Sequence, residues 1–408
     1  MIHLFINALA ASAGGGLTYV RNVLPQFAQR EDARVTVLLN PELRSQLASS
    51  HCVAFIEQTP PCGVASRFWF EQRHLPRLIR RVRADVLLST GNFALWNSPV
   101  PQILLSRNAL YTSRDFLRDL RMRGDYSLWL DTELKAEFAR WSIRLADITV
   151  APSRAFAAQL RDWTGVNVTA IQHGFDAESF YADSTPLPEP ARRELEATEG
   201  VLRLLFVSHY NYYRNFETLI RALPLLRDRL APKRVCLILT CRLHSEANPG
   251  SYSADLADRL VKQLGVANNV IELGSIPYNL LHHLYRACDI YVTAAYAESF
   301  AHPLVEAMSS GLPIAAADTE VHREICGESA LFFPRMSPVA LADQVCRLVQ
   351  DEELARSSSS KGQLRSRDFS WKEHVQQLID LAQSRFNGVI TQPAEEDSVR
   401  MPGGPHLT

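Results

Sequence analysis

Two glutamates, Glu298 and Glu306, could do chemistry together in this chain. They flank the stretch ESFAHPLVE, in which Pro303 is a favourable first residue of a helix. The free N–H groups at a helix start can bind an anion such as phosphate, and a carboxylate beside them can accept hydrogen bonds from sugar hydroxyls. The alternative is a helix-start glutamate that complements the helix dipole and an unrelated loop glutamate.

The flanking residues predict the elements that position these groups. An apolar run at residues 290–295 predicts a buried strand, and Gly311 is expected to end the helix. Pro313 then opens a second strand, Ile314–Ala317. This order of strand, loop, helix and strand aims four backbone amides at one point beyond the first strand, those of Ala301, His302, Leu304 and Val305.

The full stretch ESFAHPLVEAMSSGLPIAAAD resembles the donor-site signature of the retaining glycosyltransferases of family 4, also called glycosyltransferases group 1, which have the GT-B fold. The family typically reads E-G-F-G-x-P-x-x-E-A-M-A-x-G-x-P-V, and Ser299 and Ala301 replace two of its glycines with other small residues. The resemblance implies that Glu298 binds sugar hydroxyls near the reacting carbon and that Glu306 holds the donor ribose. It implies that the donor also contacts the helix start, residues Phe300, Ala301, His302, Pro303 and Leu304.

Strand and helix patterns alternate in both halves, which predicts the α/β class with two Rossmann-like parallel-sheet domains facing a cleft, as in GT-B. We expect an acceptor-side domain at residues 1–180 and a donor-binding domain at residues 181–369, with a linker at 183–200. A helix at residues 370–387 is expected to cross back onto the first domain. Residues 388–408 are expected to form a disordered tail.

A turn after the first strand of the second half supplies basic side chains. Where the family has two basic residues for the donor diphosphate, this chain has His209 and Arg214. An arginine keeps its charge and can clamp phosphate oxygens, whereas a histidine would make donor binding sensitive to pH. Arg214 as a solvated loop cation is the alternative. Ser275 and Ile276 lie in GSIPYN, which resembles the base-binding turn of the family.

The N-terminal half offers fewer signals. Gly15 and Gly16 belong to a glycine-rich loop that lacks the G-x-G-x-x-G spacing, so a flexible turn is the alternative to a role over the cleft. Arg107 follows a predicted strand where many family members have a histidine that faces the reacting sugar, and the resemblance gives it an acceptor contact. His173, in HGFD between the two domains, is implied to face the cleft, and a structural role is the alternative.

Composition limits the partners. A formal net charge of −1 over 408 residues excludes a general nucleic-acid binder, and the apolar runs are too short for a transmembrane helix. The N-terminus lacks the basic region of a signal peptide, and seven scattered cysteines without CxxC spacing indicate a reducing cytoplasm. We expect no metal and no cofactor apart from the nucleotide sugar as co-substrate.

Residues 66–83 carry six arginines and one glutamate along a helical pattern. A basic amphipathic segment predicts peripheral contact with an anionic membrane, here its inner face. The alternative is a crossover helix whose apolar stripe faces the sheet.

The resemblance implies retaining transfer of a sugar from a nucleotide diphosphate sugar to an acceptor hydroxyl, in bacterial polysaccharide or glycolipid synthesis. The acceptor could be a saccharide, a lipid-linked intermediate or a small molecule. Arg214, His209 and the helix-start amides would stabilise the leaving diphosphate. Since no protein nucleophile is evident, the acceptor would attack on the same face and the leaving phosphate would take its proton. Two alternatives stay open: a nucleotide-sugar epimerase or hydrolase, and a non-catalytic scaffold that binds sugar nucleotides.

Overall fold

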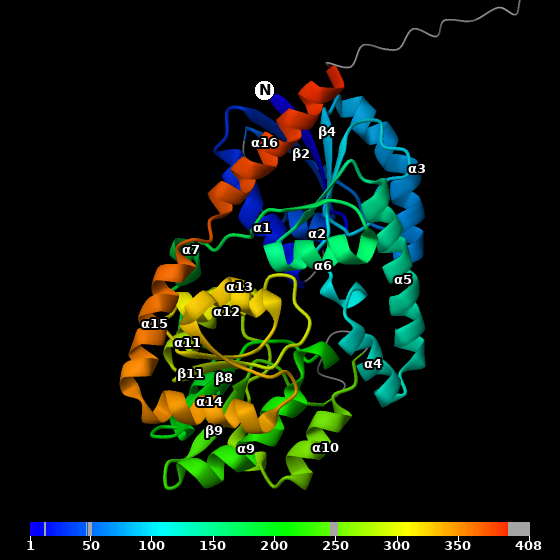
Figure 1. Cartoon of the computed structure of the whole chain (residues 1–408). Helices are drawn as coiled ribbons and strands as arrows, with labels where there is room; N and C mark the ends of the chain where they lie inside the picture. Colours follow the sequence, from blue (N-terminus) through cyan, green and yellow to red (C-terminus); the bar gives the residue numbers. More distant parts are fainter. Residues whose placement is uncertain (12–13, 46, 48–50, 245–251, 391–408) are drawn as a thin grey trace, which may run out of the picture.

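The computed structural model describes residues 1–11, 14–45, 47, 51–244 and 252–390. These residues form two parallel sheets, each with helices packed around it (Figure 1). The first sheet has seven strands in the order β3-β2-β1-β4-β5-β6-β7, and the second has six in the order β10-β9-β8-β11-β12-β13. The predicted fold class, α/β with two parallel-sheet halves, is confirmed.

The first half contains these strands: β1 Ile2–Asn7, β2 Ala33–Leu39, β3 Val53–Glu57, β4 Val86–Ser89, β5 Gln102–Leu105, β6 Ile148–Ala151 and β7 Val168–Ala170. Most of their residues are buried, because a parallel sheet is covered on both faces and its strands are therefore continuously apolar. The helices between them are α1 Gly14–Ala28, α2 Pro41–Arg44, α3 Val64–Val82, η1 Ala109–Tyr111, α4 Arg114–Arg123, α5 Tyr126–Leu145 and α6 Arg154–Thr164.

The second half begins after α7 Ala177–Tyr181 and α8 Glu189–Ala197. Its strands are β8 Leu202–Phe206, β9 Val235–Leu239, β10 Val270–Glu272, β11 Ile290–Thr293, β12 Ile314–Ala317 and β13 Ala330–Phe333. Its helices are η2 Tyr212–Arg214, α9 Phe216–Leu230, α10 Asp255–Gln263, η4 Ala267–Asn269, η5 Tyr278–Leu280, α11 Leu281–Arg286, α12 His302–Ser309, α13 Glu320–Cys326, η6 Gly327–Ser329, α14 Pro338–Gln350 and α15 Glu352–Ser366.

Local sequence signals set several boundaries. Ser153 caps α6, since its hydroxyl accepts a hydrogen bond of 3.1 Å from the Phe156 amide. Residues 112–145 divide into α4 and α5 at Gly124, which has a φ of 73° and ends α4 in the left-handed conformation. A single glycine is therefore the local signal that separates the two helices.

Other boundaries differ from expectation. The glycine-rich segment is already helical from Gly14, and the expected linker at 183–200 contains α8, which buries Ala191 and Leu195. Helix α16, Trp371–Ile390, runs beyond the expected end at 387, and the rest of the expected tail, residues 391–408, lies outside the described residues. The first sheet ends at Ala170 and the second begins at Leu202, so the domain boundary at 180 stays a prediction between them.

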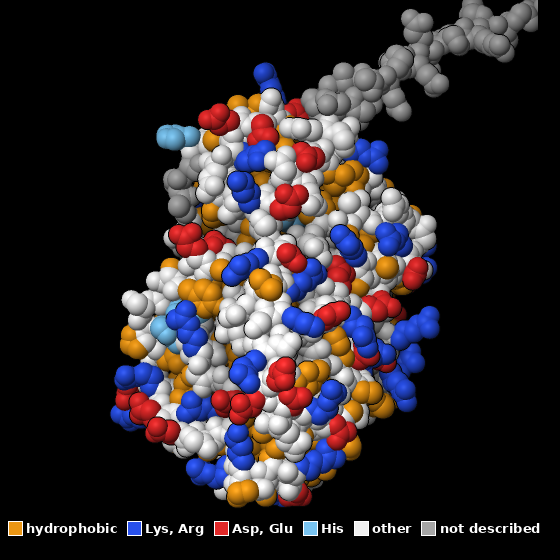
Figure 2. Space-filling model, turned by 60° about the vertical axis from the view of Figure 1, so that its left-hand side comes forward, with side chains coloured by type: hydrophobic (Ala, Val, Ile, Leu, Met, Phe, Trp, Pro, Cys, Tyr) orange, Lys and Arg blue, Asp and Glu red, His pale blue; other side chains and the backbone are white. Residues whose placement is uncertain are grey.

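The chain passes between the halves twice. After α15 it returns to the first half, where Trp371, Val375 and Leu378 of α16 join the core beneath β1 and β2. Figure 1 shows that α16 lies against α1, although the two helices are far apart in the sequence. The face in Figure 2 carries acidic and basic side chains that are interspersed, not gathered by sign. No described helix is long and apolar enough to cross a bilayer.

Candidate functional site

Arg214 and Glu298 lie together at the carboxyl ends of the neighbouring strands β8 and β11. Arg214 lies in the loop after β8 and Glu298 in the loop after β11, and their side chains form an ion pair. The two loops are also joined by their backbones, since the Tyr296 amide donates to the Tyr213 carbonyl at 3.0 Å. Parallel strands bring such loops to one edge of the sheet, which is why residues 84 positions apart meet.

Arg214 retains hydrogen-bonding capacity at this edge. Its Nε atom is buried and has no hydrogen-bond partner among the described residues. Its guanidinium carbon lies 5.0 Å from the centre of the Tyr213 ring, and the next residue, Asn215, adopts a φ of 54° and binds the Ala294 carbonyl at 3.3 Å. A buried guanidinium N–H without an acceptor is costly, so an anion at this position would be favourable.

His209 lies in the same loop as Arg214 and is exposed. Partial desolvation lowers the pKa of its imidazole below the usual value, and the charge of Arg214 lowers it further. The site therefore offers one permanent cation and, near neutral pH, a neutral imidazole.

The start of α12 offers fewer free amides than expected. Ala301 is left-handed, with φ 64° and ψ 61°, and its carbonyl accepts a hydrogen bond of 3.0 Å from the Leu304 amide. The prediction that the Leu304 amide is free is therefore wrong, and Pro303 has no N–H to offer. Among the described residues, the amides of Ala301 and His302 have no acceptor and remain available.

Glu306 is deeply buried in the first turns of α12, with 4% of its surface exposed. The Tyr285 hydroxyl donates to its Oε2 atom at 2.8 Å and also reaches the Pro303 carbonyl at 3.3 Å. Burial raises the pKa of Glu306 to about 7, and the Tyr285 hydrogen bond opposes this shift. Glu306 is thus held in one orientation, and near neutral pH it exchanges between a hydrogen-bond donor and an acceptor.

The predicted base-binding turn follows β10, which is separated from β11 by the two strands β9 and β8. Ser275 is exposed and Ile276 is buried in the core of the second half. Among the described residues, the Ser275 side chain forms no hydrogen bond to Arg214 or Glu298, which bond to each other.

Three other predicted residues meet at the junction of the two halves, namely His173, Phe300 and His302. The rings of His173 and His302 stack, with Nδ1 of His173 3.2 Å from Nε2 of His302. Phe300 packs on both rings. His173 therefore joins the halves and contacts α12, and it is buried among aromatic rings.

Arg107 lies behind this cluster and is anchored by main-chain carbonyls. Its guanidinium donates to the Gly15 carbonyl at 3.1 Å and to the Thr90 carbonyl at 2.7 Å, and it lies 4.8 Å from the centre of the Tyr19 ring. At Gly16, a Cβ would come within 3.4 Å of Ala11 and 3.8 Å of Arg107. The structure thus brings Gly15, Gly16 and Arg107 together.

Sequence reasoning missed two residues of the junction. Nδ1 of His374 in α16 donates to the Gln172 carbonyl at 2.8 Å, and its Nε2 accepts from the Tyr19 hydroxyl at 3.0 Å. Glu324 of α13 caps helix α6 of the other half, accepting from the amides of Arg154 at 2.9 Å and Ala155 at 2.6 Å. Both depend on contacts between distant segments, which local patterns do not encode.

A cavity of about 340 Å³ lies between the halves beside Glu298. Arg114, Asp115 and Gln159 of the first half face Glu298, Thr319 and Arg335 of the second. Arg335 and Asp115 form an ion pair of 2.6 Å between the halves. A larger cavity of about 540 Å³ lies at the second passage, near Phe175 and Arg367, and none of the predicted donor residues lines it. Among the described residues, no group of three or more acidic, histidine or cysteine side chains could hold a metal ion.

Two family models match the chain. The model described as Glycosyltransferase Family 4 matches residues 13–179, and the model described as Glycosyl transferases group 1 matches residues 189–365. The chain belongs to glycosyltransferase family 4. Its two sheets correspond to these two matches, since β8 opens the second sheet at Leu202.

Curated proteins similar to this family 4 chain include D-inositol 3-phosphate glycosyltransferase of Corynebacterium glutamicum (strain R), 28% identical over 218 residues, or 52% of this chain and 51% of that protein. O-antigen chain mannosyltransferase B of Escherichia coli is 27% identical over 108 residues, or 26% of this chain and 28% of that protein. The match spans about half the length of the corynebacterial relative.

Solved structures share the fold over nearly the whole chain. Sucrose-phosphate synthase from Thermosynechococcus elongatus superposes with a TM-score of 0.74 at 19% identity, over 95% of this chain and 100% of that one. HepE of Anabaena in complex with UDP-glucose superposes with a TM-score of 0.69 at 17% identity, over 94% and 100% of the two chains. At these identities the likeness establishes the fold.

Proposed function

We propose that this family 4 chain is a retaining glycosyltransferase that moves a sugar from a nucleotide diphosphate sugar to an acceptor hydroxyl, in polysaccharide or glycolipid synthesis. The observation that carries the proposal is the Arg214–Glu298 pair at the carboxyl ends of β8 and β11, with a buried Arg214 N–H that lacks a partner among the described residues. A cation and a carboxylate side by side suit a diphosphate attached to a sugar, because one binds phosphate oxygens and the other sugar hydroxyls.

In this proposal Arg214 and the amides of Ala301 and His302 bind the donor diphosphate and stabilise the charge that develops as it leaves. His209, neutral near pH 7, donates one more hydrogen bond. Glu298 accepts hydrogen bonds from the sugar, and Glu306 holds the ribose. The bond between the anomeric carbon and the phosphate oxygen breaks, the acceptor oxygen bonds to that carbon on the same face, and its proton passes to the leaving phosphate. A covalent sugar adduct on the protein would contradict this route.

A uridine nucleotide is the first donor to examine, because HepE, which shares the fold, binds UDP and UDP-glucose. The names of the curated relatives suggest acceptors that range from a phosphorylated polyol to a growing saccharide. The cavity beside Glu298 is the place we propose for the acceptor hydroxyl, since both halves line it.

The deciding experiment measures thermal unfolding with UDP, GDP, ADP and dTDP, for wild type and for Arg214→Ala. A nucleotide at about a hundred times its dissociation constant adds roughly 2.7 kcal/mol to the stability of the folded state. One nucleotide should raise the melting temperature of wild type and leave that of Arg214→Ala unchanged. Arg229→Ala, which removes an exposed ion pair with Asp343, is the matched control and should respond as wild type does.

A second measurement separates the alternatives. Glu298→Ala should keep nucleotide binding and lose sugar transfer. A wild-type protein that binds nucleotide but transfers nothing would be the scaffold. One that consumes the donor equally fast with and without acceptor would be the hydrolase or epimerase. No thermal response to any nucleotide would overturn the proposed donor site.

We also propose contact with the inner, cytoplasmic face of a membrane, through a surface that extends beyond residues 66–83. In α3, Leu75 and Ile79 are buried against the first sheet, so its apolar stripe faces the core. Trp69 points outward and is 49% exposed, and the helix together with its C-cap residue exposes five arginines, Arg73, Arg77, Arg80, Arg81 and Arg83.

Helix α5 supplies most of the exposed apolar side chains on this side, beside α3 in Figure 1. Leu134, Phe138 and Trp141 are 56%, 51% and 44% exposed. Trp96 joins the two helices, with ring centres 5.3 Å from Trp69 and 5.2 Å from Trp141. Exposed tryptophans beside arginines fit an interface with anionic lipid headgroups.

Sedimentation with vesicles of phosphatidylcholine, with and without phosphatidylglycerol, tests this contact. We expect binding to the anionic vesicles, weaker at high salt and lost in the double variant Phe138→Ser, Trp141→Ser. Leu364→Ser, at an exposed leucine of the other half, is the control. Equal sedimentation of the double variant and the wild type would overturn the membrane assignment. So would a wild-type protein that is a dimer in solution while the double variant is a monomer, because the apolar surface would then be a dimer interface.

A further inference from the structure

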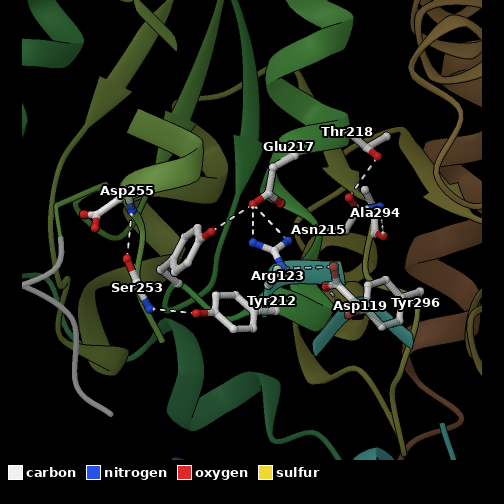
Figure 3. Close-up of polar contacts among 11 residues, drawn as sticks. Asp119, Arg123, Tyr212, Asn215, Glu217, Thr218, Ser253, Asp255, Ala294 and Tyr296 are labelled. Carbon is white, nitrogen blue, oxygen red and sulfur yellow. Dashed lines mark hydrogen bonds and ion pairs between the residues drawn. The ribbon is translucent and has the colours of Figure 1, made fainter. Parts of the chain in front are cut away.

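A buried ion-pair network connects helix α4 of the first half to the second half (Figure 3). At the end of α4, Arg123 bonds to Asp119 of its own helix at 2.9 Å and to Glu217 of α9 at 3.1 Å. Its guanidinium also lies 4.2 Å from the centre of the Tyr212 ring. The three charged side chains are 11–14% exposed, so the network is largely shielded from water.

Two tyrosine hydroxyls extend this network into the loops that carry the site. The Tyr210 hydroxyl donates to Glu217 at 2.9 Å, and the Tyr296 hydroxyl donates to Asp119 at 2.8 Å. Tyr210 lies between His209 and Arg214 in sequence, and Tyr296 lies two residues before Glu298. Both rings are buried, with 0% and 5% of their surface exposed.

The network therefore contacts each of the two loops through one tyrosine. Arg123 holds Glu217 and Asp119, and each carboxylate holds one tyrosine of one loop. Buried charges with several partners have little freedom to rearrange, because an unpaired charge at such a position is costly. Both loops are consequently hydrogen-bonded, through one tyrosine each, to carboxylates that pair with the same guanidinium group.

We propose that Arg123 and Asp119 are positioning residues for the reaction, which set the spacing of Arg214 and Glu298 through Tyr210 and Tyr296. The inference rests on the proposed function. Neither residue needs to touch the donor, since α4 acts through the loops. The first half thereby contributes to catalysis at the edge of the second sheet.

The test uses Tyr296→Phe, which removes one hydroxyl and keeps the ring. We expect kcat to fall about 10- to 100-fold, because small displacements of reacting groups cost this much. The KM for the donor and the thermal response to nucleotide should stay within about twofold of wild type, since the groups that bind the donor remain. Arg123→Gln should show the same pattern, and Arg123→Lys should recover part of kcat because its charge is kept.

Tyr181→Phe is the matched control, since its half-buried hydroxyl binds Ser309 and Ser310 at the far end of α12. It should leave kcat unchanged. If Tyr296→Phe and Arg123→Gln keep wild-type kcat while Arg214→Ala loses activity, the positioning role is wrong and the transferase proposal stands. If Arg214→Ala also keeps full activity, the proposed donor site fails first. A loss of kcat in Tyr296→Phe that merely follows a lowered melting temperature, as shown by recovery on cooling, would also overturn the positioning role.

Discussion

At the scale of single residues, the site depends on a few charged side chains and on the backbone conformation of a few residues beside them. The resemblance to the family's donor-site motifs singles out Glu298 and Arg214, and the sheet order brings them into contact. The roles of these residues stay proposals, while their proximity follows from β8 and β11 being neighbours.

The backbone of Ala301 is strained at the start of α12, and a substitution can test this. Its φ of 64° lies in the left-handed region, which costs a residue with a Cβ about 1–2 kcal/mol compared with glycine. Ala301→Gly should therefore raise the free energy of unfolding in urea, by about 1 kcal/mol or less, because glycine also makes the unfolded chain more flexible.

Ala355→Gly, in the interior of helix α15, is the control for that flexibility and should lower the stability by about 1 kcal/mol. Equal losses in the two variants would mean that Ala301 is not left-handed in solution.

At the scale of elements, continuous apolar runs identified the strands well because both faces of a parallel sheet are buried. The break between α4 and α5 was also predictable, since Gly124 ends α4 through its own left-handed conformation. Local patterns wrongly predicted that the Leu304 amide is free. Its hydrogen bond to the Ala301 carbonyl depends on the left-handed φ of Ala301, and an alanine in the sequence does not indicate that conformation. They also missed α8, whose prolines and charges resemble a linker.

Gly174 marks the closest approach of two elements. A Cβ at this position would lie 2.0 Å from the Trp371 nitrogen and 2.5 Å from the Ser370 carbonyl carbon. Both are main-chain atoms, so the segment before α16 would have to move. Gly174→Ala should lower the free energy of unfolding by about 3 kcal/mol or more and speed hydrogen exchange in α16.

Gly165→Ala provides the comparison, because Gly165 has a φ of 75° with open space around its Cβ. It should cost only about 1–2 kcal/mol, the penalty of the left-handed conformation. A Gly174 variant that is no less stable than this one would contradict the close approach.

At the scale of the whole molecule, the junction of the halves could not be derived from sequence. His173 was identified, but its partners His302 and His374 come from α12 and α16, and Glu324 reaches α6 from α13. Such contacts depend on how the two halves are placed, which no periodicity or spacing encodes.

The junction should weaken in acid. Burial, together with the charge of nearby Arg107, lowers the pKa of His302 and of His374 to about 4. A histidine that is neutral when folded and charged when unfolded stabilises the protein above pH 6.5, and this contribution is lost as the pH falls toward 4. Between pH 7 and pH 5, the wild type should lose about 2 kcal/mol more stability than His374→Gln.

The measured quantity is the difference in stability between wild type and His374→Gln at each pH, because Glu306 changes the stability of both proteins in the opposite direction. Its pKa is raised to about 7 in the folded state, so its contribution declines as the pH rises. His51→Gln, at an exposed histidine, should keep the wild-type pH dependence of stability. Parallel curves for wild type and His374→Gln would contradict a neutral, buried imidazole.

The two passages of the chain between the halves touch each other, since the Phe175 amide donates to the Phe369 carbonyl at 3.1 Å and Gly174 packs on Trp371. Two tethers joined at one place act as a single pivot. Any rotation that leaves them intact has its longest lever arm on the opposite side of the molecule, where α4 lies in Figure 1. A turn of a few degrees that barely moves the two tethers would thus displace α4 much further.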